Sequence, residues 1–109
     1  MGRNSGLGEF EQAVMLVILR LRDGAYGVPI RRELEERLKR DVSFGAVYAT
    51  LERLEAKGFL SSWTGGATAE RGGRSKRYYK IEAPGQKALN EAYDRALNLW
   101  TALPQGAAS

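Results

Sequence analysis

Two short strand patterns lie on either side of a glycine-rich loop in the second half of the chain, so any fold of this chain must contain a long hairpin. Residues 59–63 read FLSSW, residues 75–81 read SKRYYKI, and TGGATAERGGR joins them. Strand-forming residues bounded by glycine and polar residues predict a β-hairpin with an extended connection. Because side chains alternate along a strand, Tyr79 and Ile81 share a face, and we expect Ile81 to mark the core side.

The loop and the second strand concentrate positive charge. Five basic residues and no acidic residue lie between positions 71 and 80, at Arg71, Arg74, Lys76, Arg77 and Lys80. Elsewhere basic and acidic residues are mixed, as in the segment 31–41, and the net charge of the chain is only +4. A positive field that is focused at one place indicates a partner rich in phosphate groups.

Three helical patterns precede the hairpin, at residues 9–22, 28–40 and 44–57. In each, apolar residues recur at the spacings expected for one face of a helix. Ser43 is a suitable N-cap for the third helix, and Gly58 is a typical C-terminal stop. The first turn of the third helix is rich in small residues, which allow close approach either to another helix or to a binding partner.

The order of these elements predicts an α+β fold that is mostly α, namely a winged helix-turn-helix. The second and third helices, joined by the short turn at residues 41–43, form the helix-turn-helix, and the hairpin forms the wing. In this arrangement the third helix enters the major groove of DNA by its N-terminal end, and the wing lies along the phosphate backbone or in the adjacent minor groove. Gly72 and Gly73 let the tip of the wing turn tightly.

Two apolar helices indicate a homodimer. Residues 13–19 read AVMLVIL and are apolar on nearly every side of the first helix. A last helix, predicted over residues 84–103, carries apolar residues at alternating steps of four and three, which form a heptad seam. A chain of this size has little use for such a helix in its own core, so pairing with a second chain explains it better. We expect the dimer interface at Phe10, Val14, Leu89, Tyr93, Ala96 and Trp100.

These elements divide the chain into four parts. We expect a flexible tail at residues 1–6, a winged helix-turn-helix DNA-binding domain at 7–82, a C-terminal dimerisation helix at 83–103 and a second tail at 104–109.

The composition argues against several other classes of function. Cys and His are both absent, which removes disulfides and most zinc, haem and iron–sulfur sites, so we expect no metal and no cofactor. The acidic residues lie on solvated helical faces without a catalytic spacing, so we do not expect an enzyme. The longest apolar run, residues 13–19, is too short to cross a membrane, and no signal peptide is visible. The expected location is therefore cytoplasmic.

Four segments together resemble the PadR-like family of transcriptional regulators. They are LGEFEQAVMLVILRL, GAYGVPIRRELEER, SFGAVYATLERLEAKGFL and ERGGRSKRYYKI, and the resemblance covers residues 7–97. It implies a dimeric winged-helix repressor whose first and last helices form the dimer interface. The family usually has Thr-Pro ahead of the glycine that starts the last helix, whereas this chain has EAPG at residues 82–85.

The resemblance also implies DNA contacts from three places: the residue before the second helix, the third helix and the wing. The implied positions are Tyr26, Ser43, Gly45, Ala46, Val47, Tyr48, Thr50, Arg71, Gly72, Gly73, Arg74, Ser75 and Lys76. The helical period places Val47 in the core, so we leave it out of the candidate site. Tyr48 and Tyr78 each fit either a phosphate donor or a packed aromatic side chain.

A second interpretation is a sensor for a small hydrophobic effector. Some family members bind flat hydrophobic compounds between Trp residues of the last helix, and Trp100 is the candidate here by that analogy. Trp100 also fits a plain residue of the helical seam. One protein can both bind DNA as a regulator and sense a ligand, because a ligand held in the dimer can control the release of DNA. A module for RNA or for general charge binding would fit the basic loop but would not explain the heptad seam.

Overall fold

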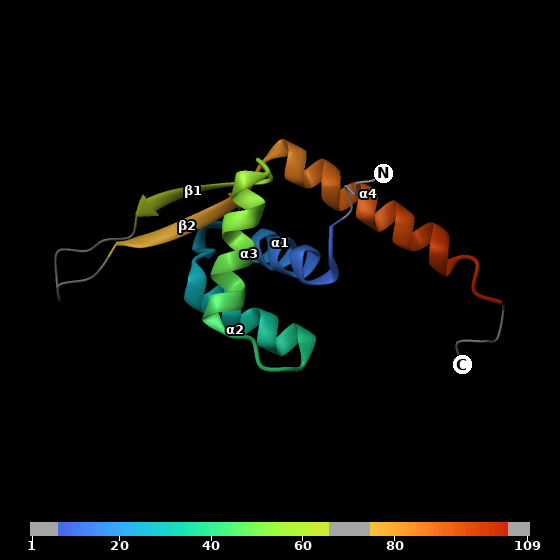
Figure 1. Ribbon diagram of the computed structural model, residues 1–109, viewed down its shortest axis with the longest axis horizontal. Coiled ribbons are helices and arrows are strands. Elements are labelled where there is room, and N and C mark those ends of the chain that lie inside the picture. The colour runs from blue at the N-terminus through green and yellow to red at the C-terminus, as the bar shows by residue number, and fades with distance from the viewer. Residues whose placement is uncertain (1–6, 66–74, 105–109) are drawn as a thin grey trace.

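The computed structural model describes residues 7–65 and 75–104, and this part of the chain forms four α-helices and a two-stranded sheet. The helices and strands are α1 (Glu9–Leu21), a short 3-10 helix η1 (Arg22–Gly24), α2 (Gly27–Leu38), α3 (Phe44–Ala56), β1 (Leu60–Gly65), β2 (Lys76–Ile81) and α4 (Ala83–Trp100). The first three helices pack together, the hairpin projects from one side of them, and α4 projects from the other (Figure 1). The winged helix-turn-helix predicted from the sequence is therefore confirmed.

Local signals set the ends of the helices. The Ser43 hydroxyl oxygen accepts a hydrogen bond from the backbone N–H of Ala46 at 3.0 Å, which confirms Ser43 as the N-cap of α3. After the end of α3, Gly58 takes a φ of 81°, a left-handed conformation that glycine adopts without steric cost. The helix α2 ends two residues earlier than predicted, because Lys39 also turns left-handed, with a φ of 58°.

The core lies between α1, α2, α3 and the sheet. Its largest fully buried side chains are Met15, Ile30, Leu34, Leu51, Leu54, Val14 and Val47. Burying such a side chain stabilises the fold by about 1.5–3 kcal/mol each. The sequence places Val14 in the dimer interface, but its side chain is fully buried in its own chain and is not available to a partner. This position is corrected from interface to core.

The hairpin strand β2 contacts the rest of the fold. The strands β1 and β2 pair antiparallel, with Leu60 opposite Ile81, and Ile81 packs against the core as expected. On the other edge of β2, the segment before α2 contributes an isolated bridge between Tyr26 and Tyr78. The backbone N–H of Tyr79 donates to the carbonyl of Ala25 at 2.9 Å, so the base of the wing is fixed relative to the start of α2.

The helix α4 buries one side of its first half, at Gly85, Leu89 and Ala92, and leaves its second half exposed. Gly85 is buried against the backbone of Phe59, where a Cβ would overlap the carbonyl oxygen, and Leu89 and Ala92 are buried on the side of α4 that faces α1. Every residue from 93 to 104 is exposed in the single chain. None of the helices in the described part of the chain combines the length and the apolar character that a membrane crossing needs.

Candidate nucleic-acid interface

The first two turns of α3 form an open surface of small and aromatic side chains. The exposed residues at its start are Ser43, Phe44, Gly45, Ala46, Tyr48 and Ala49. A Cβ built on Gly45 would meet only the Ser43 hydroxyl, at 3.9 Å. Among the described residues, Gly45 therefore faces open space and does not pack against another helix.

The two aromatic residues of this surface are held by α2. The rings of Phe44 and Tyr48 stack, with centroids 6.1 Å apart and an interplanar angle of 17°. The guanidinium of Arg31 lies 4.4 Å from the centroid of the Phe44 ring. The hydroxyl end of Tyr48 lies against Gly27, the first residue of α2, where any Cβ would overlap it. Tyr48 is thus packed on one side and remains 46% exposed on the other.

An ion pair on α2 holds the turn that leads into α3. The Nη1 of Arg31 donates to Oε2 of Glu35 and to the carbonyl of Val42, both at 3.0 Å. The same carboxylate oxygen of Glu35 accepts the backbone N–H of Val42 at 3.0 Å. Both polar backbone groups of Val42 are therefore satisfied by α2, which fixes where α3 begins.

Thr50, a residue of the predicted site, is buried in the structure, and so is Val47, which was left out of that site. Thr50 is only 3% exposed, and its hydroxyl oxygen accepts a hydrogen bond from Nη2 of Arg53 at 3.2 Å. It lies on the buried side of α3 together with Val47, which is fully buried as the helical period indicates. We therefore remove Thr50 from the candidate interface.

The base of the wing carries an aromatic cluster. The rings of Trp63 and Tyr78 stack at a centroid distance of 5.6 Å, and Tyr26 meets Tyr78 edge-on at 5.4 Å. The Nζ of Lys76 lies 5.5 Å from the centroid of the Tyr26 ring. Tyr78 is therefore a packed aromatic residue. Sequence reasoning missed Trp63, although the hairpin register that pairs it with Tyr78 would have indicated it.

The tip of the wing lies outside the described residues. Arg71, Gly72, Gly73 and Arg74 belong to this part, and so do the predicted tails, except for position 104. Within the described part, Ser75 and Arg77 are exposed and Lys76 is partly exposed. Lys80 lies 4.0 Å from Glu82 at the end of β2, so this cation has a carboxylate nearby.

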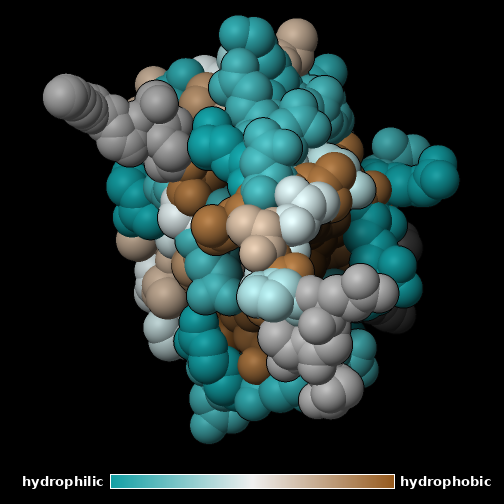
Figure 2. Space-filling model, turned by 90° about the vertical axis from the view of Figure 1, so that its right-hand side faces the viewer, coloured by the Kyte–Doolittle hydropathy of each residue, from teal (hydrophilic) through white to brown (hydrophobic). Residues whose placement is uncertain are grey.

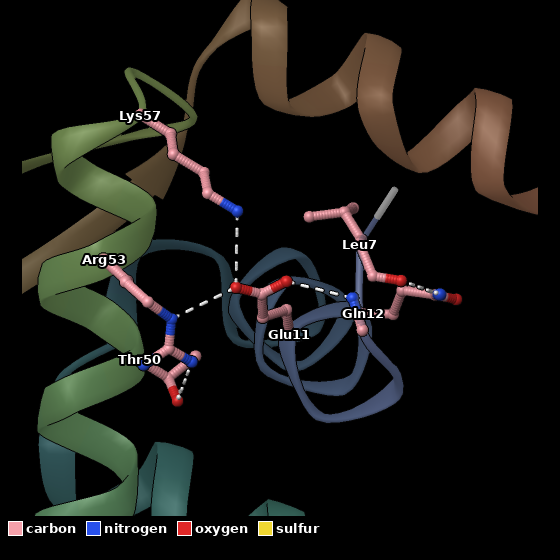
Figure 3. A network of polar contacts seen from close by, with 7 residues as sticks. Leu7, Glu11, Gln12, Thr50, Arg53 and Lys57 are labelled. Atoms are coloured by element: carbon pink, nitrogen blue, oxygen red, sulfur yellow. Dashed lines mark hydrogen bonds and ion pairs between the residues drawn. The ribbon is translucent and has the colours of Figure 1, made fainter. Parts of the chain in front are cut away.

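A polar network joins α1 to the C-terminal half of α3 (Figure 3). Oε2 of Glu11 lies 3.3 Å from Nε of Arg53 and 3.5 Å from Nζ of Lys57, while its Oε1 accepts the backbone N–H of Gly8 at 2.9 Å. Burial acts to raise the pKa of Glu11, but the Gly8 N–H and the two cations outweigh it and hold the pKa below its ordinary value. The network keeps Arg53 occupied on the α1 side of α3.

This pKa shift gives a prediction for stability. A carboxyl group whose pKa is lowered on folding contributes stability above its ordinary pKa of 4.5, and that contribution is lost as the pH falls below it. We expect Glu11→Gln to lower the free energy of unfolding by about 1 kcal/mol at pH 7, and the difference from wild type to shrink toward pH 3. Urea denaturation at the two pH values measures this. The exposed Glu36→Gln serves as control, and an equal loss at both pH values would contradict the charge-based role of Glu11.

A second candidate surface lies between α1 and α4. A groove of about 320 Å³ opens there, and six of its residues are apolar or aromatic: Leu16, Leu19, Leu89, Ala92, Tyr93 and Ala96. Leu16 is 54% exposed and Tyr93 is 66% exposed, although both are large and hydrophobic in character. Figure 2, viewed from the side toward which α4 projects, shows hydrophobic residues in the hollows between hydrophilic ones. Apolar surface of this kind is typical of a protein–protein contact.

The predicted interface residues divide between this surface and the core. Tyr93, Ala96 and Trp100 are exposed in the single chain, with Trp100 at 66%. Leu89 is only 7% exposed and packs on its own core, and Phe10 is half-buried. Leu16 and Leu19 were not in the predicted set, because an all-round apolar helix does not show which of its sides its own core uses.

The comparison with family profiles decides the family. Residues 15–91, which are most of the chain, match the profile described as "Transcriptional regulator PadR-like family". The chain belongs to the PadR-like family. Its members are transcriptional regulators and not enzymes, which agrees with the prediction from the sequence.

Solved structures of PadR-like proteins share the fold. A PadR-like transcription factor from Bacteroides fragilis is 27% identical, with a TM-score of 0.73 over 85% of this chain and 84% of that one. A PadR-family transcriptional regulator from Eggerthella lenta DSM 2243 is 26% identical, with a TM-score of 0.67 over 86% of this chain and 81% of that one. The complex structure of hsRosR-S4 is 26% identical, with a TM-score of 0.68 over 90% of this chain and 77% of that one. The comparison with curated proteins found no match.

Membership of the PadR-like family makes this chain a DNA-binding transcriptional regulator. The described residues contain the helix-turn-helix and both strands of the hairpin.

Proposed function

We propose that this PadR-like protein is a homodimeric repressor that binds a pseudo-palindromic operator through α3 and the wing. The observation that carries the proposal is a continuous series of contacts from the start of α3 to the base of the wing. Tyr48 of α3 lies against Gly27 at the start of α2, and the neighbouring Tyr26 packs on Tyr78 of β2. One surface therefore joins the start of α3, the start of α2 and the wing.

The electrostatics of this surface suit a duplex. The N-termini of α2 and α3 both open on it, and helix N-termini carry unpaired N–H groups and a partial positive charge. Lys76 and Arg77 add positive charge from β2, and the sequence places Arg71 and Arg74 farther along the wing. We propose DNA contacts from Tyr26, Ser43, Gly45, Ala46, Tyr48, Ser75 and Lys76 together with the wing-tip residues Arg71, Gly72, Gly73 and Arg74.

The dimer is proposed to form through the faces of α1 and α4 that the single chain leaves exposed. In this arrangement residues 7–82 form the DNA-binding unit and residues 83–103 the dimerisation helix. A two-fold symmetric dimer presents two copies of α3 to the same side of a duplex. The operator then has two like half-sites, whose centres are separated by about 10 bp or a multiple of it.

The wing supplies affinity for phosphates and little base discrimination, which leads to a prediction. Removing one cation from each of two wings removes two released counterions, so Arg74→Ala should make the salt dependence of binding shallower by about 2 in log–log slope. Specific and scrambled duplexes should lose affinity by the same factor. Fluorescence anisotropy across a salt series measures both quantities.

A second variant serves as the control for Arg74→Ala. Arg95→Ala removes the same charge from an exposed position of α4, the helix that projects from the side opposite to the hairpin (Figure 1), and should leave the slope unchanged. A loss confined to one sequence, with an unchanged slope, would instead make Arg74 a base-reading residue.

The groove between α1 and α4 supports a second proposed function, the sensing of a flat hydrophobic effector. Its lining is mainly apolar, and Trp100 lies farther along the same helix with 66% of its surface exposed. In the dimer, a planar aromatic ligand between two such helices would change their separation and hence the spacing of the two α3 helices. Titrating a planar aromatic dye while following Trp fluorescence tests this. Quenching that persists in Trp100→Phe, or no quenching at all, would remove Trp100 from a ligand site.

A further inference from the structure

The exposed start of α3 lacks the side chains that read guanine or adenine by paired hydrogen bonds. Bidentate recognition in the major groove uses Arg or Lys for guanine and Asn or Gln for adenine. None of these four residue types occurs between positions 43 and 49, where the exposed residues are Ser43, Phe44, Gly45, Ala46, Tyr48 and Ala49.

Guanidinium groups beside this surface make contacts within the chain. That of Arg40, which lines a hollow with Ser43 and Ala46, lies 5.7 Å from the centroid of the Phe10 ring. Arg31 donates to Glu35 and to the backbone of Val42, and its guanidinium covers the Phe44 ring. Arg53 pairs with Glu11 and donates to Thr50 on the α1 side of α3. Neither Arg31 nor Arg53 is placed to reach a base edge without giving up these contacts.

What α3 presents instead is apolar and fixed in position. Phe44 is 39% exposed and Tyr48 is 46% exposed, and Ala46 and Ala49 add methyl groups beside them. Arg31 holds one end of the aromatic pair, and the close packing on Gly27 holds the other. In the major groove, the apolar group that such side chains contact is the C5-methyl of thymine.

We propose that α3 recognises its operator through thymine methyl groups, so that each half-site carries A·T pairs where the first two turns of α3 contact it. Phe44 is the leading contact, because its ring is exposed, lies in the first turn and is held in place by Arg31. This inference rests on the proposed function and adds to it the base, the atom and the kind of contact.

The test replaces thymine by uracil. The probe is the top-ranked duplex selected from a random pool, made once with thymine and once with uracil in both half-sites. Uracil lacks only the C5-methyl group and keeps the same hydrogen-bonding edge. We expect binding to weaken by about fourfold for each methyl group contacted, hence about fifteenfold for one methyl in each half-site. The salt slope should not change, because the phosphate contacts are the same.

Two controls locate the effect. Uracil placed only in the segment between the half-sites, which α3 does not contact, should leave the affinity unchanged. Phe44→Ala, with its fold checked by circular dichroism, should bring the thymine-to-uracil affinity ratio down toward one, while Ala56→Val on the last turn of α3 should leave that ratio unchanged. The wild-type comparison stands without any variant.

The outcomes separate this inference from the proposed function. Equal affinity of the wild-type protein for the thymine and uracil duplexes overturns the inference while operator binding stands. A selected consensus whose half-sites contain no thymine overturns it too. If the selection enriches no consensus at all, the proposed function fails and the inference fails with it.

Discussion

Gly45→Leu is expected to abolish the preference for the operator over a scrambled duplex while leaving the protein folded. A leucine at this position projects from the open first turn of α3 and would hold the helix backbone away from the major groove. Sequence preference of DNA-binding proteins is typically 10³-fold or more, and we expect it to fall to about one. Non-specific binding through the wing should persist, because the phosphate contacts do not depend on α3 entering the groove.

The fold should tolerate this change. A Cβ at Gly45 meets only the Ser43 hydroxyl at 3.9 Å, so a larger side chain has room in the free protein. Replacing glycine by leucine within a helix also favours the helical state by roughly 0.5–1 kcal/mol. Ala56→Leu places the same side chain on the exposed last turn of α3 and serves as the matched control. Anisotropy on both duplexes, with circular dichroism for folding, decides the matter: a Gly45→Leu protein that keeps the wild-type preference would show that α3 is not the reader.

The second large effect concerns the dimer. We expect Leu16→Glu combined with Tyr93→Glu to give a folded monomer. Both side chains are exposed in the single chain, at 54% and 66%, so a glutamate at either position is solvated when no partner is present. In a dimer formed through α1 and α4, each unpaired carboxylate would be buried, at a cost of about 3–5 kcal/mol. Loss of the dimer should also weaken operator binding, because only one half-site is then held at a time.

Light scattering at micromolar concentration measures the mass directly. Asn98→Glu adds the same charge to an exposed position of α4 that lies off the heptad seam, and it should remain dimeric. Leu89 is a poor choice for this test, since it is 7% exposed and a charge there would damage the core of each chain. A wild-type protein that is monomeric under these conditions would contradict the proposed interface.

Much of the fold follows from local signals in the sequence. The caps and stops at Ser43 and Gly58 are properties of a few consecutive residues, and the structure confirms both. The hairpin was predictable because strand-forming residues flank a glycine-rich loop, and the face of Ile81 follows from simple alternation. Such features depend little on what the rest of the chain does, which is why sequence reasoning finds them.

The candidate site depended more on tertiary contacts and was predicted less completely. Thr50 shares the helical stripe of Val47, Leu51 and Leu54, so its burial was visible in the same period that placed Val47 in the core. The contacts of Arg31 with Val42 and Phe44 join α2 to the start of α3, and no local pattern predicts which cation will make them. These contacts matter for function because they fix the surface that α3 presents.

For the apolar helices too, the sequence alone does not show which side chains face the core. An all-round apolar segment such as residues 13–19 indicates that both a core and a partner use the helix, but it does not divide the side chains between them. The structure makes this division, with Val14 in the core and Leu16 on the surface.

Selection of bound fragments from a pool of random duplexes tests most directly whether this protein reads DNA as a symmetric dimer. The wild-type protein should enrich one pseudo-palindromic consensus, with two like half-sites whose centres are separated by about 10 bp or a multiple of it. A single unrepeated half-site, or a pool that shows no enriched sequence at any salt concentration, would contradict it.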